Sequence, residues 1–374
     1  EAAGHSGFIQ VIVQAEPSAL DGIRGRARSR GADIGRDLPL VEGFAAAVPA
    51  SEIEGLADDP AVRRIVPDRS IAPAMDIAAP AAGIPWSRGS GPSAGPTGRG
   101  VVVAVIDSGI FPHEDLAPGS ILASIDFVNP RRRGNGSPVT SDPYGHGTHI
   151  AGIVAGRSVA VPEGGGAVGG VAPDAGLVSL RVLDRDGTGD VSDLIAAITW
   201  CIDNKDSFGI RVINLSLGQR VAESIETDPL ARAVEEAWRS GLVVVTAAGN
   251  RGLLGDGYGT VVSPGNDPLV ITVGALDDRG TARTDDDLVA DFSSRGPSPI
   301  DFVLKPDLAA PGTRIVSLRV PHSTIDRLMP EARVAINSLG SSRAFEPRYF
   351  EMSGSSMSAA LVSGVVALML EEDP

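Results

Sequence analysis

Apolar and polar positions alternate in short segments along the first part of the chain. Ser51 and Glu54 have the spacing of a capping box, which favours a helix starting there. The order strand, helix, strand, helix, strand predicts a small α+β unit. The spacing of apolar positions puts these elements at residues 8–14, 18–30, 41–48, 51–57 and 62–66.

The composition changes after this unit. Residues 72–100 are rich in Pro, Gly, Ala and Ser, which is typical of an extended linker. Beyond it, short and nearly unbroken apolar runs alternate with helical patterns. The runs predict strands at residues 101–106, 177–183, 212–217, 242–246 and 270–275, and the helical patterns include residues 193–203 and 229–239.

Strands that are apolar on both faces are typical of a parallel sheet that is covered by helices on both sides. The expected fold class is therefore α/β, with a three-layer domain after the small α+β unit. In such open sheets, functional residues lie at the carboxyl ends of the strands. Candidate chemistry is expected there.

Composition and charge exclude several classes of partner. The chain has 374 residues, of which 43% are hydrophobic and 21% charged, and its formal charge is −15. This charge opposes binding to nucleic acid and to anionic membranes. The longest apolar run, residues 359–370, is shorter than the roughly 18 residues of a membrane span. The only cysteine, Cys201, is expected to be a buried small residue.

Three residues have the chemistry of a nucleophilic triad. Asp107 ends the first strand of the larger domain, His146 lies between two glycines at a helix start, and Ser356 begins the last apolar helix. Each alone is most simply a capping or turn residue. Together they supply a nucleophile, a base that takes its proton, and a carboxylate that orients the base. Asn250, which follows the strand at 242–246, could donate to an oxyanion or lie in an exposed turn.

The larger domain resembles the subtilase family of serine peptidases. The resemblance runs from Val101 to the end of the chain, and its motifs follow one another in the family's order. They are VAVIDSGI (103–110), GHGTHIAG (145–152), GGVAP (169–173), NLSLG (214–218), AAGN (247–250), FSSRGP (292–297), KPDLAAPG (305–312) and GSSMS (354–358).

The resemblance implies a subtilisin-like fold and a secreted serine endopeptidase that acts on polypeptides and needs no cofactor for its chemistry. Any secretory signal is expected to have been removed, since residues 1–4 lack a basic region. Catalytic roles fall on Asp107, His146 and Ser356, with Asn250 as oxyanion donor. Substrate would be held by Ser216, Leu217, Gly218 and Gly249, with the first three pairing with it as an added strand.

The N-terminal unit resembles the family's inhibitory prosegment, through residues 8–13, 41–49 and 59–62. Such a unit would be ferredoxin-like, would inhibit and help fold the larger domain, and would be cut off by it near Met75-Asp76. We therefore expect a prosegment at residues 1–75 and a peptidase domain at 76–374, which stops earlier than most family domains. A permanently attached accessory domain is the alternative.

Some positions depart from the family pattern. Ser355, Ser358 and Ala360 replace the usual Thr, Ala and Pro around the nucleophile. Asp115 matches a calcium-ligand position of the family, so the resemblance allows a structural calcium ion there. The loop at 158–166 lacks the asparagines that resemble calcium ligands in some relatives. Residues 319–348 form a longer segment than in many relatives and could cover or extend the cleft.

Two other functions compete with a serine peptidase. A metal hydrolase would use His113, His146 and His149 with Asp107 or Glu114, but it leaves Ser356 and Asn250 without a role. A relative without catalysis would bind peptides or a partner only, and the altered nucleophile motif keeps this possibility open.

Overall fold

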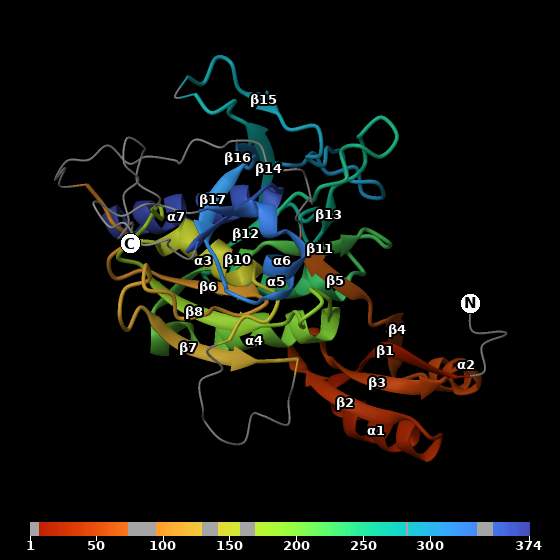
Figure 1. Ribbon diagram of the computed structural model, residues 1–374. Coiled ribbons are helices and arrows are strands. Elements are labelled where there is room, and N and C mark those ends of the chain that lie inside the picture. Colours follow the sequence, from red (N-terminus) through yellow and green to blue (C-terminus); the bar gives the residue numbers. More distant parts are fainter. Residues whose placement is uncertain (1–6, 74–94, 129–140, 158–168, 282, 335–346) are drawn as a thin grey trace.

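The computed structural model describes residues 7–73, 95–128, 141–157, 169–281, 283–334 and 347–374. Its N-terminal unit has the order β-α-β-β-α-β and an antiparallel sheet in the order β2-β3-β1-β4 (Figure 1), which is a ferredoxin-like arrangement. The elements are β1 (Phe8–Ala15), α1 (Leu20–Ser29), β2 (Asp33–Leu38), β3 (Gly43–Pro49), α2 (Ile53–Ala57) and β4 (Val62–Pro67).

The sequence missed one strand and misplaced one cap in this unit. Strand β2 was not predicted, because only Ile34 and Leu38 are apolar among its six residues. The capping box was wrong: the chain enters a 3-10 helix at Ala50–Glu52, so Ser51 lies within the first turn and makes no capping hydrogen bond. Two further 3-10 turns lie at Pro17–Ala19 and Pro39–Val41.

The larger domain is built on a mainly parallel sheet in the order β15-β14-β12-β10-β6-β8-β7, with β16 also paired to β14. Only β15 runs antiparallel to its neighbour. This arrangement confirms the expected α/β fold class. The strands are β6 (Val102–Asp107), β7 (Ile121–Asp126), β8 (Gly176–Arg181), β10 (Ile210–Leu215), β12 (Val243–Ala247), β14 (Ile271–Asp277), β15 (Leu288–Val289) and β16 (Leu308–Pro311).

Helices cover both faces of this sheet. Helices α3 (His146–Ala155) and α7 (Ser355–Glu372) pack together over one face, and α4 (Val191–Phe208) and α5 (Pro229–Arg239) cover the other. Among the described residues, α7 alone is long and apolar enough to be a membrane span, and more than half of it is buried against the sheet. Its apolarity is therefore that of a core helix. Cys201, on α4, is buried as expected.

Two small sheets lie beside the main one. One has the order β13-β11-β5-β9 and the other the order β17-β19-β18, the latter accompanied by helix α6 and a 3-10 turn at Pro330–Ala332. The predicted linker thus begins with a strand, β5, and its residues 74–94 lie outside the described part. The elements are β5 (Ser70–Pro73), β9 (Gly189–Asp190), β11 (Leu217–Arg220), β13 (Val262–Ser263), β17 (Ile315–Leu318), α6 (Thr324–Leu328), β18 (Arg333–Val334) and β19 (Tyr349–Met352).

The long segment at 319–348 packs next to the start of α3. Backbone N–H groups of Thr324 and Ile325 donate to the carbonyls of Pro143 and Tyr144 at 3.0 Å. Residues 335–346 lie outside the described part. The described portion therefore supports the segment that leads into His146.

The N-terminal unit rests on α4 and α5. Ile12, Leu38 and Val41 lie in the same apolar cluster as the inward faces of these helices. Arg36 lies over the Phe127 ring and forms an ion pair with Asp193 on α4, at 2.5 Å. The contact is thus apolar at its centre and charged at its edge, as in other interfaces between proteins.

His149 is a buried link between α3 and the β17-β19 sheet. Its Nε2 lies 3.2 Å from the carbonyl of Ile315 and 3.0 Å from that of Phe350, and it is fully buried. Burial, with a smaller effect of His146, lowers the pKa of His149 to about 3. The folded chain therefore holds this imidazole neutral.

A pH-dependent loss of stability follows from this shift. Unfolded histidine takes up its proton near pH 6.5, whereas folded His149 resists it down to about pH 3. Its contribution is complete above pH 6.5 and is lost as the pH falls, at up to about 1.4 kcal/mol per pH unit. In Ser356→Ala chains, the free energy of unfolding measured with urea should fall less as the pH is lowered when His149 is also changed to Gln. Equal losses would contradict the assignment.

Candidate active site

Asp107 and His146 meet at the carboxyl end of β6. Asp107 is the last residue of this strand and His146 the first residue of α3, and both are fully buried. Nδ1 of His146 lies 2.9 Å from each carboxylate oxygen of Asp107, and the backbone N–H of Ser108 donates to the same carboxylate at 2.7 Å. Because the carboxylate only accepts, Nδ1 carries the proton and Nε2 is left as a base.

The glycines around His146 allow this close approach. A Cβ atom at Gly147 would lie 2.2 Å from the carbonyl oxygen of Gly109 and 3.1 Å from the Asp107 side chain. Gly145 has φ of 104°, a backbone conformation that other residues rarely adopt. A larger residue at Gly147 would push α3 away from the end of β6 and separate the pair, whereas one at Gly145 would collide with Ser323.

Ser356 is the second residue of α7, the helix that packs against α3. Its hydroxyl donates to the carbonyl of Ser216 at 2.8 Å, and the Ser216 hydroxyl donates to the carbonyl of Ser356 at 2.9 Å. Nε2 of His146 is buried and has no hydrogen-bond partner among the described residues. The Ser356 hydroxyl therefore donates to Ser216 and makes no hydrogen bond with His146.

Asn250 is oriented by the residue before Ser356. Its Oδ1 accepts from the backbone N–H of Ser355 at 2.9 Å and from the Ser355 hydroxyl at 3.0 Å. Its Nδ2 then points away from these donors, and in the described part of the chain it finds no acceptor. Ser355 also accepts from the N–H of Gly249. This bridging role was missed, because Ser355 stood out only as a departure from the family pattern.

The strand that the sequence predicts to pair with substrate, β11, is already paired with another segment of the same chain. Leu217 lies opposite Pro73, and Gly218 opposite Ala72, in antiparallel register. On its other side, β5 pairs with β9, and the Ile71 side chain is 1% exposed. Figure 1 shows β5 entering this sheet from the N-terminal unit. A segment from the N-terminal unit therefore occupies the place that the sequence assigned to an extended polypeptide.

The histidines of the metal-hydrolase alternative are not gathered into a ligand set. His149 contacts two backbone carbonyls, and Nε2 of His113 lies 3.1 Å from the carbonyl of Arg348. No group of three or more His, Cys, Asp or Glu side chains that could hold a metal occurs within the described ranges. The arrangement gives this alternative no support.

The expected calcium site at Asp115 is not tested by the described residues. The Asp115 carboxylate is buried and accepts a hydrogen bond from the hydroxyl of Tyr349, whereas calcium takes six to eight oxygen ligands. Asp115 belongs to no group of three or more metal-ligating side chains among the described residues, and the loop at 158–166 lies outside them. Calcium binding stays a prediction without structural support.

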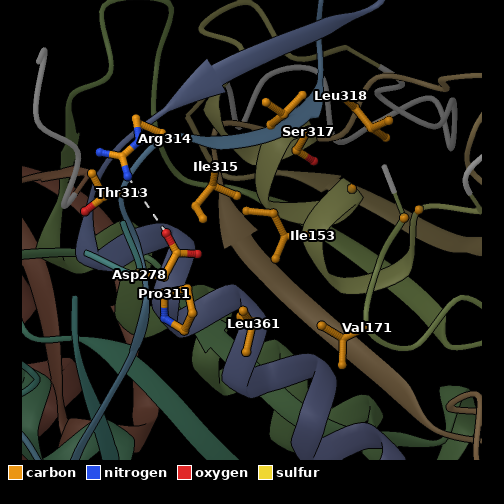
Figure 2. Close-up of a pocket in the computed structure, with 14 residues that line it drawn as sticks. Ile153, Val171, Asp278, Pro311, Thr313, Arg314, Ile315, Ser317, Leu318 and Leu361 are labelled. Atoms are coloured by element: carbon orange, nitrogen blue, oxygen red, sulfur yellow. Dashed lines mark ion pairs between the residues drawn. The ribbon is translucent and has the colours of Figure 1, made fainter. Parts of the chain in front are cut away.

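An apolar pocket lies elsewhere. Figure 2 shows Ile153, Val171 and Leu361 among the residues that line it, together with the ion pair of Arg314 and Asp278. Neither Asp107, His146, Ser356 nor Asn250 lines it. The candidate chemistry is therefore at the strand ends and not in this pocket.

Two curated relatives align with most of the chain. Serine protease AprX of Bacillus subtilis is 44% identical over 287 residues, which cover 74% of this chain and 58% of AprX. An alkaline protease of Alkalihalobacillus alcalophilus is 31% identical over 328 residues, covering 86% of this chain and 67% of that protein. The chain thus spans less than two thirds of AprX.

A solved structure shares the fold. Fervidolysin from Fervidobacterium pennivorans, a keratinolytic enzyme related to subtilisin, superposes with a TM-score of 0.70 at 23% identity, over 99% of this chain and 55% of that one. The sequence model of the subtilase family matches residues 98–374. This match covers most of the chain, and the protein therefore belongs to the subtilase family.

Proposed function

We propose that this chain is a secreted serine endopeptidase that hydrolyses peptide bonds in extended polypeptides. The observation that carries the proposal is the buried contact of His146 Nδ1 with both oxygens of Asp107, which leaves Nε2 available as a base. Subtilases need no cofactor for catalysis. The net charge of −15 suits a soluble secreted protein.

The reaction would be acyl transfer. His146 takes the proton of Ser356 as its oxygen attacks the peptide carbonyl, and Asp107 stabilises the imidazolium that forms. Nδ2 of Asn250 and the backbone N–H of Ser356 donate to the oxyanion. His146 then protonates the leaving amine, and water releases the acyl group from Ser356 by the same steps.

We also propose that residues 1–75 are an inhibitory prosegment, cut near Met75-Asp76 by the domain at 76–374. Strand β5 supports this, because it lies paired with Leu217 and Gly218 and ends at Pro73, shortly before the proposed cut. The cut itself lies outside the described residues. Backbone pairing with both β11 and β9 would present the chain as a bound polypeptide.

Charged contacts hold β5 in this position. Glu223, which follows β11, pairs with Arg64 at 2.6 Å and with Arg69 at 2.7 Å. The carboxylate of Asp68 accepts from the N–H of Ser192 in the first turn of α4, where a negative charge is favoured. Asp68 and Arg69 directly precede β5, so their contacts would fix its register over the candidate site.

The alternative is a relative that binds peptides without cutting them. The Ser356 hydroxyl favours it in one respect, because it donates to Ser216 and not to His146. Hydrogen bonds of a catalytic serine are often formed only when substrate is attacked, so this geometry is compatible with both functions. Whether the chain cleaves itself decides between a peptidase and a peptide-binding relative.

The intact mass of the purified chain over time tests the function. The parent chain should lose about 75 residues, while Ser356→Ala should stay whole because it lacks the nucleophile. Ser358→Ala is the matched control: it lies on the same helix, and its hydroxyl donates to the carbonyl of Ala310. It should cut itself like the parent. An intact parent chain would support the binding-only alternative, and sequencing the new N-terminus would locate the cut.

Loss of the Asn250 amide should slow the chemical step. Asn250→Ala should lower kcat on a peptide substrate about 10²–10³-fold with little change in KM, because the donor acts on charge that develops in the transition state. Asn204→Ala removes an amide on α4 that donates to Trp200 and should leave kcat unchanged. A normal kcat in Asn250→Ala would remove this residue from the reaction.

Loss of the Glu223 charge should loosen β5. In Ser356→Ala chains, Glu223→Gln should speed hydrogen exchange of the β5 amides about fivefold, or about 1 kcal/mol, since Arg64 and Arg69 are part-exposed and screened. Glu235→Gln breaks a pair with Arg239 within α5 and should have no effect on β5. Equal exchange in all three chains would contradict the role of Glu223.

A further inference from the structure

Asp142 is a buried carboxylate just before the helix that carries His146. It is 2% exposed and accepts hydrogen bonds through both oxygens. Oδ1 accepts from the Ser108 hydroxyl at 2.8 Å and from the N–H of Gly145 at 2.7 Å. Oδ2 accepts from the N–H and the hydroxyl of Thr148, each at 2.8 Å. All the acceptor positions on this side chain therefore face donors from two segments.

These donors belong to the two segments that carry Asp107 and His146. Ser108 follows Asp107 directly, and its hydroxyl also accepts from the N–H of Gly147, the residue after His146. The Thr148 hydroxyl accepts from the N–H of Phe111, in the loop beyond Asp107. Asp142 thus stands at the centre of a polar network that joins the end of β6 to the first turn of α3.

The position of Asp142 is costly for a carboxylate. Burial raises its pKa, and its hydrogen bonds oppose that effect. The start of α3, where three of its bonds end, provides a favourable field for negative charge. No ion pair of Asp142 with an arginine or lysine occurs in the described part of the chain. All four of its hydrogen bonds come from donors, so the site is built for a carboxylate that accepts.

We propose that Asp142 is a positioning residue for the reaction: its carboxylate fixes α3 against the end of β6, so that His146 meets both oxygens of Asp107. This inference rests on the proposed function. Asp142 does not touch the reacting atoms and acts through Ser108, Gly145 and Thr148. A small misplacement of reacting groups is enough to cost about 100-fold in rate.

Asp142→Asn is the sharpest change, since it keeps the shape of the side chain. Either orientation of the amide puts an NH2 group against a backbone N–H, of Thr148 or of Gly145, and leaves that donor unpaired. Asp228→Asn is the matched control. Asp228 is also buried and caps a helix, α5, by accepting from Leu230 and Ser263, but it has no contact with the Asp107–His146 pair.

The rate of self-cleavage is the first measurement. In the full chain, β5 is already paired with β11. The first-order rate of self-cleavage therefore reports the chemical step and not the binding of a substrate. Asp142→Asn should cleave itself about 10- to 100-fold more slowly than the parent, and Asp228→Asn at the parent rate. Urea unfolding of the same chains separates the rate from stability. A parent rate in Asp142→Asn would overturn the proposal.

A spectroscopic measurement does not depend on activity. In the Ser356→Ala background, the proton on Nδ1 of His146 should give a far-downfield resonance in the ¹H NMR spectrum, because this proton is hydrogen-bonded to a carboxylate. Adding Asp142→Asn should shift or broaden this resonance, and adding Asp228→Asn should not. An unchanged resonance in Asp142→Asn would also overturn the proposal.

A second variant covers the case in which Asp142→Asn does not fold. Thr148→Val removes only the hydroxyl that joins Asp142 to the backbone N–H of Phe111, keeps the shape of the side chain, and should slow self-cleavage about tenfold. A parent rate would refute the positioning role. If the parent chain itself does not cleave, the proposed function fails, and the resonance in the Ser356→Ala background still decides whether Asp142 holds the pair.

Discussion

The contact between Asp107 and His146 depends on two backbones being held at a fixed distance. Asp107 ends a strand whose neighbours on both sides are parallel, and His146 starts a helix packed on the same sheet. Both side chains are buried, so an error in their separation would leave a charge without a partner in a region of low dielectric. Three features hold the distance between Asp107 and His146: the glycines beside His146, the network at Asp142 and the packing of α3 on α7.

Much of the architecture was accessible from the sequence, for identifiable reasons. Strands such as β6 are buried on both faces, so nearly every residue is apolar and the pattern is plain. Helix α5 was predicted with its observed bounds from its apolar periodicity, and in the structure Asp228 caps it and Pro229 begins it. Strand β2 was missed because it exposes alternate polar residues. Strand β5 was missed because its partners, Leu217 and Gly189, lie more than a hundred residues away.

The same division holds at the candidate site. Asp107, His146, Ser356 and Asn250 could be proposed from the sequence because their chemistry is recognisable in a motif. Ser355, Ser108 and Asp142 were not assigned a role, because each acts by bonding a residue that lies far away in the sequence. The turn of the Ser356 hydroxyl toward Ser216 was equally out of reach, since a side-chain rotation leaves no mark on the sequence.

Strand β5 lies inside its small sheet, with β11 on one side and β9 on the other. Departure of such a strand would leave two facing edges whose N–H and C=O groups are unpaired, and edges of this kind accept almost any extended chain through its backbone. The same property invites unwanted association between protein molecules. Here β11 has four residues and β9 has two, so the opening between them is too short to pair with a long strand. Such an opening would accept extended chains of many sequences, but only over a few residues.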